Sequence, residues 1–179
     1  MTSEEKYLIS ECRIIIIGPQ GFTGYVNTEL RSLGFRHVQI NDERNCLCRR
    51  PSVNIIAEYG DNGFSQMNDN DEVESPLIYA FDFVKGAGAI VVMPGDDREL
   101  CGKKDIRLWA AEYMAGYCGF WNMADCDWLW QSIPAIREGK TEEAAQKTVA
   151  HICARIAANI AVGREVKRFP RFYLCRNLE

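Results

Sequence analysis

In the first third of the chain, continuous apolar runs alternate with apolar residues at helical spacing, which predicts alternating strands and helices. Residues 4–11 form a predicted short helix, and an apolar run over residues 12–17 predicts a strand that is buried on both faces. Apolar residues then recur at helical spacing over residues 21–33, and Gly34 is typical of a helix end. Two further strands are predicted over residues 38–40 and 53–57.

The pattern resumes after a polar interruption. Residues 58–76 contain six acidic residues and neither Lys nor Arg, which favours a solvated loop and leaves open a lid or metal-binding segment. Residues 77–84 fit a helix or a strand, and residues 89–93 predict a buried strand. The remaining predictions are a helix over 103–117, a strand over 119–123, a short helix or turn over 128–137, a long helix over 141–163 capped by Thr141, and a strand over 169–175.

Strands that alternate with helices predict an α/β fold with a largely parallel sheet. We therefore expect a Rossmann-like, three-layer fold with a mainly parallel sheet, which ends in a long helix and a strand. The length of 179 residues is typical of a single domain.

Composition narrows the class of protein. The net charge of −4 speaks against a general nucleic-acid binder, which carries a basic patch. The N-terminus does not have the pattern of a signal peptide, and the uncharged runs are too short to cross a bilayer. Eight cysteines in such a chain predict reduced thiols and a cytoplasmic protein. Cys46 and Cys48 form a C-x-C pair without a second pair, which does not favour a zinc site.

Three glycines form the most informative motif. Gly18, Gly21 and Gly24 stand between a predicted strand and a predicted helix, where glycines allow a sharp turn and let a phosphate approach the backbone. The helix that follows would present unpaired N–H groups to that phosphate. The motif therefore predicts a nucleotide or dinucleotide site; a tight turn without a ligand is the alternative.

Charged residues beyond two other strands fit the same site. Asp42 lies where an acidic residue binds ribose hydroxyls in such folds, and Arg44 and Arg49 match the geometry of phosphate. Asp96 and Asp97 follow a buried strand, where a carboxylate can hold Mg²⁺ beside a triphosphate or cap a helix. Asp42 also fits a solvated turn, and Arg44 and Arg49 also fit a solvated surface.

Two stretches of the chain resemble the ThiF/MoeB/HesA superfamily, the enzymes that activate ubiquitin-like proteins. They are Ile14 to Asp42, with its strand, glycine turn, helix and second strand, and Ile90 to Asp97, a hydrophobic strand followed by an acidic pair. The helix over 141–163 and the strand after it are also similar to the family's closing elements. The resemblance implies a fold that binds ATP and Mg²⁺ and adenylates the C-terminus of a small ubiquitin-like or sulfur-carrier protein.

The resemblance also implies roles for individual residues. The glycines Gly18, Gly21 and Gly24 would border the phosphates, Asp42 would hold the ribose, Arg44, Asn45 and Arg49 would contact ATP, and Asp96 would hold Mg²⁺. The chain differs from the family at Gln20, where the family has a glycine, and it lacks the paired C-x-x-C motifs. Catalytic residues are therefore not assigned, and a degenerate member without activity is an alternative.

Two other functions remain open. The sequence from Gly18 to Gly24 is similar to the G-x-x-G-F-T-G turn of some NAD(P)-binding reductases, and Asp42 would then favour NAD. The chain has no Tyr-x-x-x-Lys pair, which speaks against a short-chain reductase. The aromatic segment Trp121 to Trp130 instead favours a non-catalytic domain that pairs with a partner, and we expect a homodimer.

Overall fold

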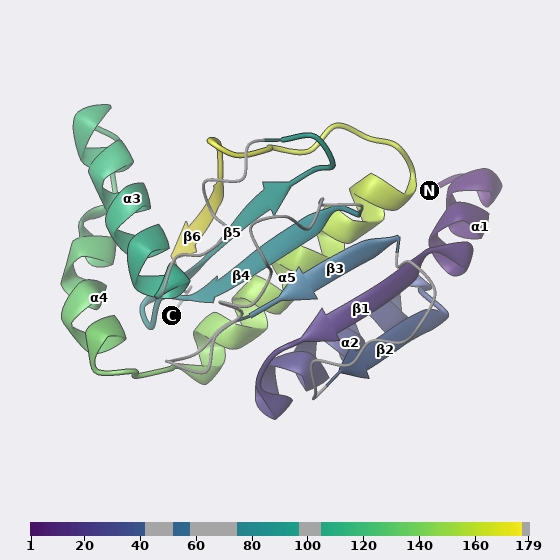
Figure 1. Ribbon diagram of the computed structural model, residues 1–179, viewed down its shortest axis with the longest axis horizontal. Helices are drawn as coiled ribbons and strands as arrows, with labels where there is room; N and C mark the ends of the chain where they lie inside the picture. The colour runs from purple at the N-terminus through teal and green to yellow at the C-terminus, as the bar shows by residue number, and fades with distance from the viewer. Residues whose placement is uncertain (42–51, 58–74, 97–104, 177–179) are drawn as a thin grey trace.

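One mixed sheet organises the protein. The computed structural model describes residues 1–41, 52–57, 75–96 and 105–176, and within them six strands pair in the order β2-β1-β3-β4-β5-β6 (Figure 1). The strands are β1 (Arg13–Ile17), β2 (His37–Asn41), β3 (Val53–Ile56), β4 (Leu77–Asp82), β5 (Gly86–Val92) and β6 (Tyr173–Arg176). The first four strands in this order are parallel, whereas β5 and β6 each pair antiparallel. This result confirms a Rossmann-like α/β fold with a mostly parallel sheet.

Helices cover both faces of the sheet. They are α1 (Ser3–Glu11), α2 (Gln20–Leu33), α3 (Ile106–Phe120), α4 (Asp127–Arg137) and α5 (Glu143–Ala161). One core lies between the sheet and α1, α2 and α5, and a second lies between the sheet and α3 and α4. Figure 1 shows α2 and α5 on one side of the strands and α3 and α4 on the other. None of the described helices has the length and apolar character needed to span a membrane.

The two cores follow from the alternation of side chains along each strand. In β4, Ile78 contributes to the core under α5, and its neighbour Tyr79 contributes to the core under α3. All six residues of β4 are buried, as expected for a central strand with helices on both faces. The apolar pattern of residues 77–84 fitted a helix or a strand, and the structure shows that it belongs to a strand.

Three helices end at the residue that the sequence predicts, α1 at Glu11, α2 at Leu33 and α4 at Arg137, whereas two other local predictions are wrong. Gly34 terminates α2 in the left-handed conformation, with φ of 102°. Residues 119–123 do not form a strand, because α3 continues to Phe120 and a turn follows. Thr141 does not cap the long helix. The N-cap is Glu142, whose N–H donates to the buried carboxylate of Asp82 at 2.8 Å.

Candidate functional site

The turn between β1 and α2 lies at a special point of the sheet. The chain crosses from β1 to β2 on one side, while β3 pairs with β1 on the other, so the strand order reverses between β1 and β3. Ligands of open α/β sheets bind outside the carboxyl ends of the strands at such a point. We call the side of the sheet where β1, β3 and β4 end the carboxyl edge, and the opposite side the amino edge.

The N-terminus of α2 opens onto the carboxyl edge without a cap. Its N-cap residue, Pro19, has no side chain that can accept a hydrogen bond, and the first helical bond runs from the N–H of Thr23 to the carbonyl of Pro19. In the described part of the chain no side chain accepts from the N–H groups of Gln20, Gly21 and Phe22. By contrast, Thr2 and Glu5 form a capping box at α1. The start of α2 is therefore a positive helix end whose first N–H groups are not capped by any described side chain, which suits an anion.

The three glycines have different surroundings. A β-carbon at Gly18 would lie 3.0 Å from the carbonyl oxygen of Ala57, so this glycine lets the turn pass directly against the end of β3. A β-carbon at Gly21 would lie 3.4 Å from Oε1 of Gln146 on α5. At Gly24 it would meet no atom within 4 Å. The structure thus gives Gly18 a packing role and leaves Gly21 and Gly24 exposed in the first turns of α2.

A buried carboxylate also lies at the carboxyl edge. Asp82 ends β4 and is fully buried. Its Oδ1 accepts from the N–H of Val84 at 2.7 Å, and its Oδ2 accepts from the N–H of Glu142 at 2.8 Å. Burial raises the pKa of Asp82, although these hydrogen bonds, the charge of Arg107 and a hydrogen bond to Gln146 act in the opposite direction. Gln146 therefore links Asp82 to the first turn of α2.

Arg107 compensates this buried charge. Its Nε donates to the backbone carbonyl of Asp82 at 2.5 Å, its Nη2 donates to the carbonyl of Lys140, and Nη2 lies 3.7 Å from Oδ1 of Asp82. The two side chains are 5% and 0% exposed, so both charges are shielded from water. This pair therefore joins the end of β4 to the starts of α3 and α5.

The sequence contains a signal that Asp82 is a buried residue with a charged partner, although hydrophobic periodicity alone does not identify it. Asp82 is the one charged residue in an otherwise apolar run over residues 77–84, and a charge within a buried strand requires a partner. Arg107 lies in the first turn of an apolar helix and carries the complementary charge. The pairing of these two residues, 25 positions apart, depends on the tertiary structure.

The structure does not bring Asp96 to the glycine turn. Asp96 follows β5, which runs antiparallel to β4, so the end of β5 lies at the amino edge, beside the start of β4. The prediction that places Asp96 beside the phosphates is wrong for this reason. Its Oδ2 accepts from the N–H of Met93 at 2.9 Å, and its Oδ1 lies 3.7 Å from Arg168. Asp96 therefore closes a turn next to the segment that leads to β6.

The other predicted residues remain predictions. Asp42, Arg44, Asn45, Arg49 and Asp97 lie outside the described residues. Among the residues that are described, no group of three or more His, Cys, Asp or Glu side chains is placed to hold a metal ion.

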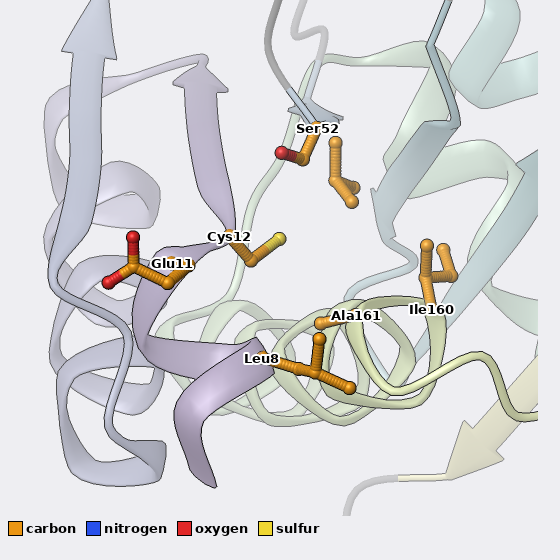
Figure 2. Close-up of a pocket in the computed structure, with 7 residues that line it drawn as sticks. Leu8, Glu11, Cys12, Ser52, Ile160 and Ala161 are labelled. Carbon is orange, nitrogen blue, oxygen red and sulfur yellow. The ribbon is translucent and has the colours of Figure 1, made fainter. Parts of the chain in front are cut away.

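A pocket of about 290 Å³ opens at the amino edge, away from the glycine turn (Figure 2). It lies between α1, the starts of β1 and β3, and the end of α5, and its lining is Leu8, Glu11, Cys12, Ser52, Val53, Ile160 and Ala161. Glu11, Cys12 and Ser52 provide the polar side chains of its wall, and the sulfur of Cys12 points toward Ser52. Burial raises the pKa of the Cys12 thiol, and its hydrogen bond with Ser52 lowers it.

Comparison with known proteins supports the fold. No protein-family model and no curated protein matches the sequence. Among solved structures, E. coli MccB is similar, with a TM-score of 0.54 and 11% sequence identity. The match covers 97% of this chain and 64% of the MccB chain, so the present chain spans less than two thirds of MccB. At this identity the similarity shows the fold alone, in agreement with the Rossmann-like arrangement of the sheet and helices.

Proposed function

We propose that this protein binds a nucleotide, and specifically ATP, at the carboxyl edge of its sheet. The observation that carries the proposal is the uncapped N-terminus of α2, which directs its first N–H groups to the point where the strand order reverses. Gly21 and Gly24 are exposed there, and neither has a side chain that would keep a phosphate from the backbone. The sequence resemblance to the ThiF/MoeB/HesA superfamily selects ATP among the nucleotides.

We propose that Mg²⁺ binds to this site together with the nucleotide. The described residues provide no carboxylate cluster for a metal ion, and Asp96 lies at the opposite edge. The phosphates of the nucleotide would provide ligands to the cation, as is usual for Mg²⁺ at nucleotide sites. Asp42, Arg44, Asn45 and Arg49 remain the predicted contacts to the ribose and the phosphates.

Titration of the full chain tests the binding. We expect heat of binding with MgATP in a calorimeter, and Gly21→Glu should weaken affinity about tenfold or more because it adds an anion at a positive helix end. Gly116→Glu is the control for an added carboxylate, since Gly116 is also an exposed helical glycine but lies on α3, where a β-carbon would meet no atom within 4 Å. No binding at millimolar MgATP would end the proposal. Binding of NADH but not ATP would favour the dinucleotide alternative.

The activity that we propose for this site is adenylation of the C-terminal carboxylate of a small ubiquitin-like or sulfur-carrier protein. A carboxylate oxygen would attack the α-phosphorus of ATP, and pyrophosphate would leave. Isotope exchange between pyrophosphate and ATP, dependent on a candidate carrier protein, measures this step. ATP binding without exchange across such carriers would identify a degenerate member of the superfamily.

An exposed aromatic surface favours a second role, as a domain that pairs with a further copy of the chain. Phe120 and Trp121 are 80% and 62% exposed, and Met123 and Trp130 are also exposed nearby in sequence, on the α3–α4 turn and on α4. Exposed apolar surface of this kind marks protein interaction sites. Light scattering should report a homodimer that Trp121→Glu weakens, and a monomer at high concentration would contradict this proposal.

A further inference from the structure

Two thiols meet at the junction of α3 and α4. Cys118 lies in the last turn of α3, and Cys126 is the N-cap residue of α4. The thiol of Cys126 lies near enough to Cys118 to affect the pKa of the Cys118 thiol, and its Sγ donates to the carbonyl of Ala124 at 3.6 Å; both cysteines are free. Cys118 is only 2% exposed, whereas Cys126 is partly accessible to solvent. The pair therefore combines one buried and one accessible sulfur.

The backbone of the intervening turn brings these sulfurs together. The N–H of Met123 donates to the carbonyl of Cys118 at 2.9 Å, which reverses the chain directly after α3. Asn122 and Asp125 adopt left-handed conformations, with φ of 50° and 61°. Asn and Asp are the residues other than glycine that adopt this conformation most readily. The turn thus returns Cys126 to the end of the helix that carries Cys118.

We propose that Cys118 and Cys126 form a reversible intramolecular disulfide in exchange with a low-molecular-weight disulfide such as oxidised glutathione. The thiolate of Cys126 attacks glutathione disulfide, breaks its S–S bond and releases one glutathione. Cys118 then loses its proton to solvent, and its sulfur attacks the Cys126 sulfur of the mixed disulfide and releases the second glutathione. The protein gives up two electrons and two protons, and the oxidant becomes two glutathione thiols.

Accessibility sets the order of these two steps. Burial, with a smaller effect of the neighbouring Cys126, raises the pKa of Cys118 to about 12, so this thiol stays protonated at neutral pH. Cys126 can meet the oxidant because it is partly accessible, and Cys118 is placed to resolve the mixed disulfide because the turn returns Cys126 to the end of α3. The bridge would fix the turn that carries Trp121 and Met123. This proposal does not depend on nucleotide binding.

Peptide mapping of the full chain tests the proposal. The reduced, folded protein is treated with oxidised glutathione, quenched with N-ethylmaleimide and digested with chymotrypsin, which cuts after Phe120 and Trp121, between the two cysteines. We expect one linked pair of peptides that contains Cys118 and Cys126, has lost two hydrogens and separates on reduction with dithiothreitol.

Two variants make the outcome decisive. Cys126→Ser should abolish the linked pair, and circular dichroism would establish that it is folded; Cys175→Ser, which alters an exposed cysteine on β6, should leave the linked pair unchanged. Recovery of Cys126 as a stable glutathione adduct would overturn the proposal. So would a bridge from Cys126 to a second chain, or alkylation of both thiols in the folded protein after exposure to the oxidant.

Discussion

The turn after β1 passes so close to Ala57 that a β-carbon on Gly18 would lie 3.0 Å from the carbonyl oxygen of Ala57. The N–H of Ala57 donates to the carbonyl of Ile17 at 2.8 Å, which holds the end of β3 in this place. A β-carbon would also lie 3.1 Å from the ring of Phe22, a fully buried side chain. The first glycine of the motif is therefore required by packing, whether or not a ligand binds.

Substitution of this glycine should lower stability. We expect Gly18→Ala to lower the free energy of unfolding by about 1–3 kcal/mol, because the β-carbon forces the backbone of Ala57 to move. Urea denaturation followed by circular dichroism measures this change. Gly24→Ala is the control, since its β-carbon meets open space in a helix and should increase stability by about 0.5–1 kcal/mol. Equal effects of the two substitutions would contradict the close approach.

Loss of the buried cation should be more damaging. Arg107→Met leaves the carboxylate of Asp82 buried without its counter-charge, and we expect it to lower the free energy of unfolding by about 3–5 kcal/mol. Arg137→Met provides the comparison, because Arg137 pairs with Glu112 at 2.8 Å on the surface and should contribute about 0–1 kcal/mol. Chemical denaturation of both variants gives the difference. A loss at Arg107 no larger than that at Arg137 would show that Asp82 does not need its partner.

The N-terminal helix should respond to acid through Glu5. The hydrogen bond from the backbone N–H of Thr2 to Glu5, at 2.8 Å, and the contact with Arg164 lower the pKa of the Glu5 carboxyl from its ordinary value. A carboxyl whose pKa is lower in the folded state stabilises that state above its unfolded pKa, and this stabilisation is lost as pH falls. The wild type should therefore be more stable than Glu5→Gln at pH 7, and the difference should shrink as pH falls through and below 4.5.

Denaturation of the two proteins at a series of pH values measures this difference. Arg164→Gln should weaken its dependence on pH, because one of the interactions that favour the ionised carboxyl is then absent. A difference between wild type and Glu5→Gln that stays constant between pH 7 and pH 3 would contradict the role of the ionised carboxyl.

Thiol reactivity should follow burial. Cys175 is exposed on β6, whereas Cys153 is fully buried on α5, and burial raises the pKa of Cys153 strongly. Burial also raises the pKa of Cys12 beside the amino-edge pocket. A time course with N-ethylmaleimide, read by peptide mass spectrometry, should label Cys175 well before Cys12 and Cys153, which should stay largely unmodified in the folded protein. Labelling of Cys153 as fast as Cys175 would show that α5 opens in the native state.

The spacing of hydrophobic residues along the chain was enough to predict the first strand and the helix that follows it. The isoleucines of β1, the apolar stripe of α2 and its end at Gly34 are visible in sequence, because burial on one or both faces imposes a spacing of two or 3.6 residues. The same argument predicted the Rossmann-like, mainly parallel sheet. It failed at residues 119–123, where an aromatic run belongs to the exposed end of α3 and its turn rather than to a strand.

Only the tertiary structure decided which charged residues lie at the carboxyl edge of the sheet and which lie at the amino edge. The apolar run of β5 contains no information on the direction of the strand, because a buried strand has the same pattern in parallel and antiparallel pairing. Antiparallel pairing with β4 carries Asp96 to the amino edge, away from Gly18. Asp82, at the end of a parallel strand, comes to the carboxyl edge and meets Arg107. The sequence by itself thus determined the glycine turn and its helix, whereas strand direction, a property of the assembled sheet, decided which charges lie beside that turn.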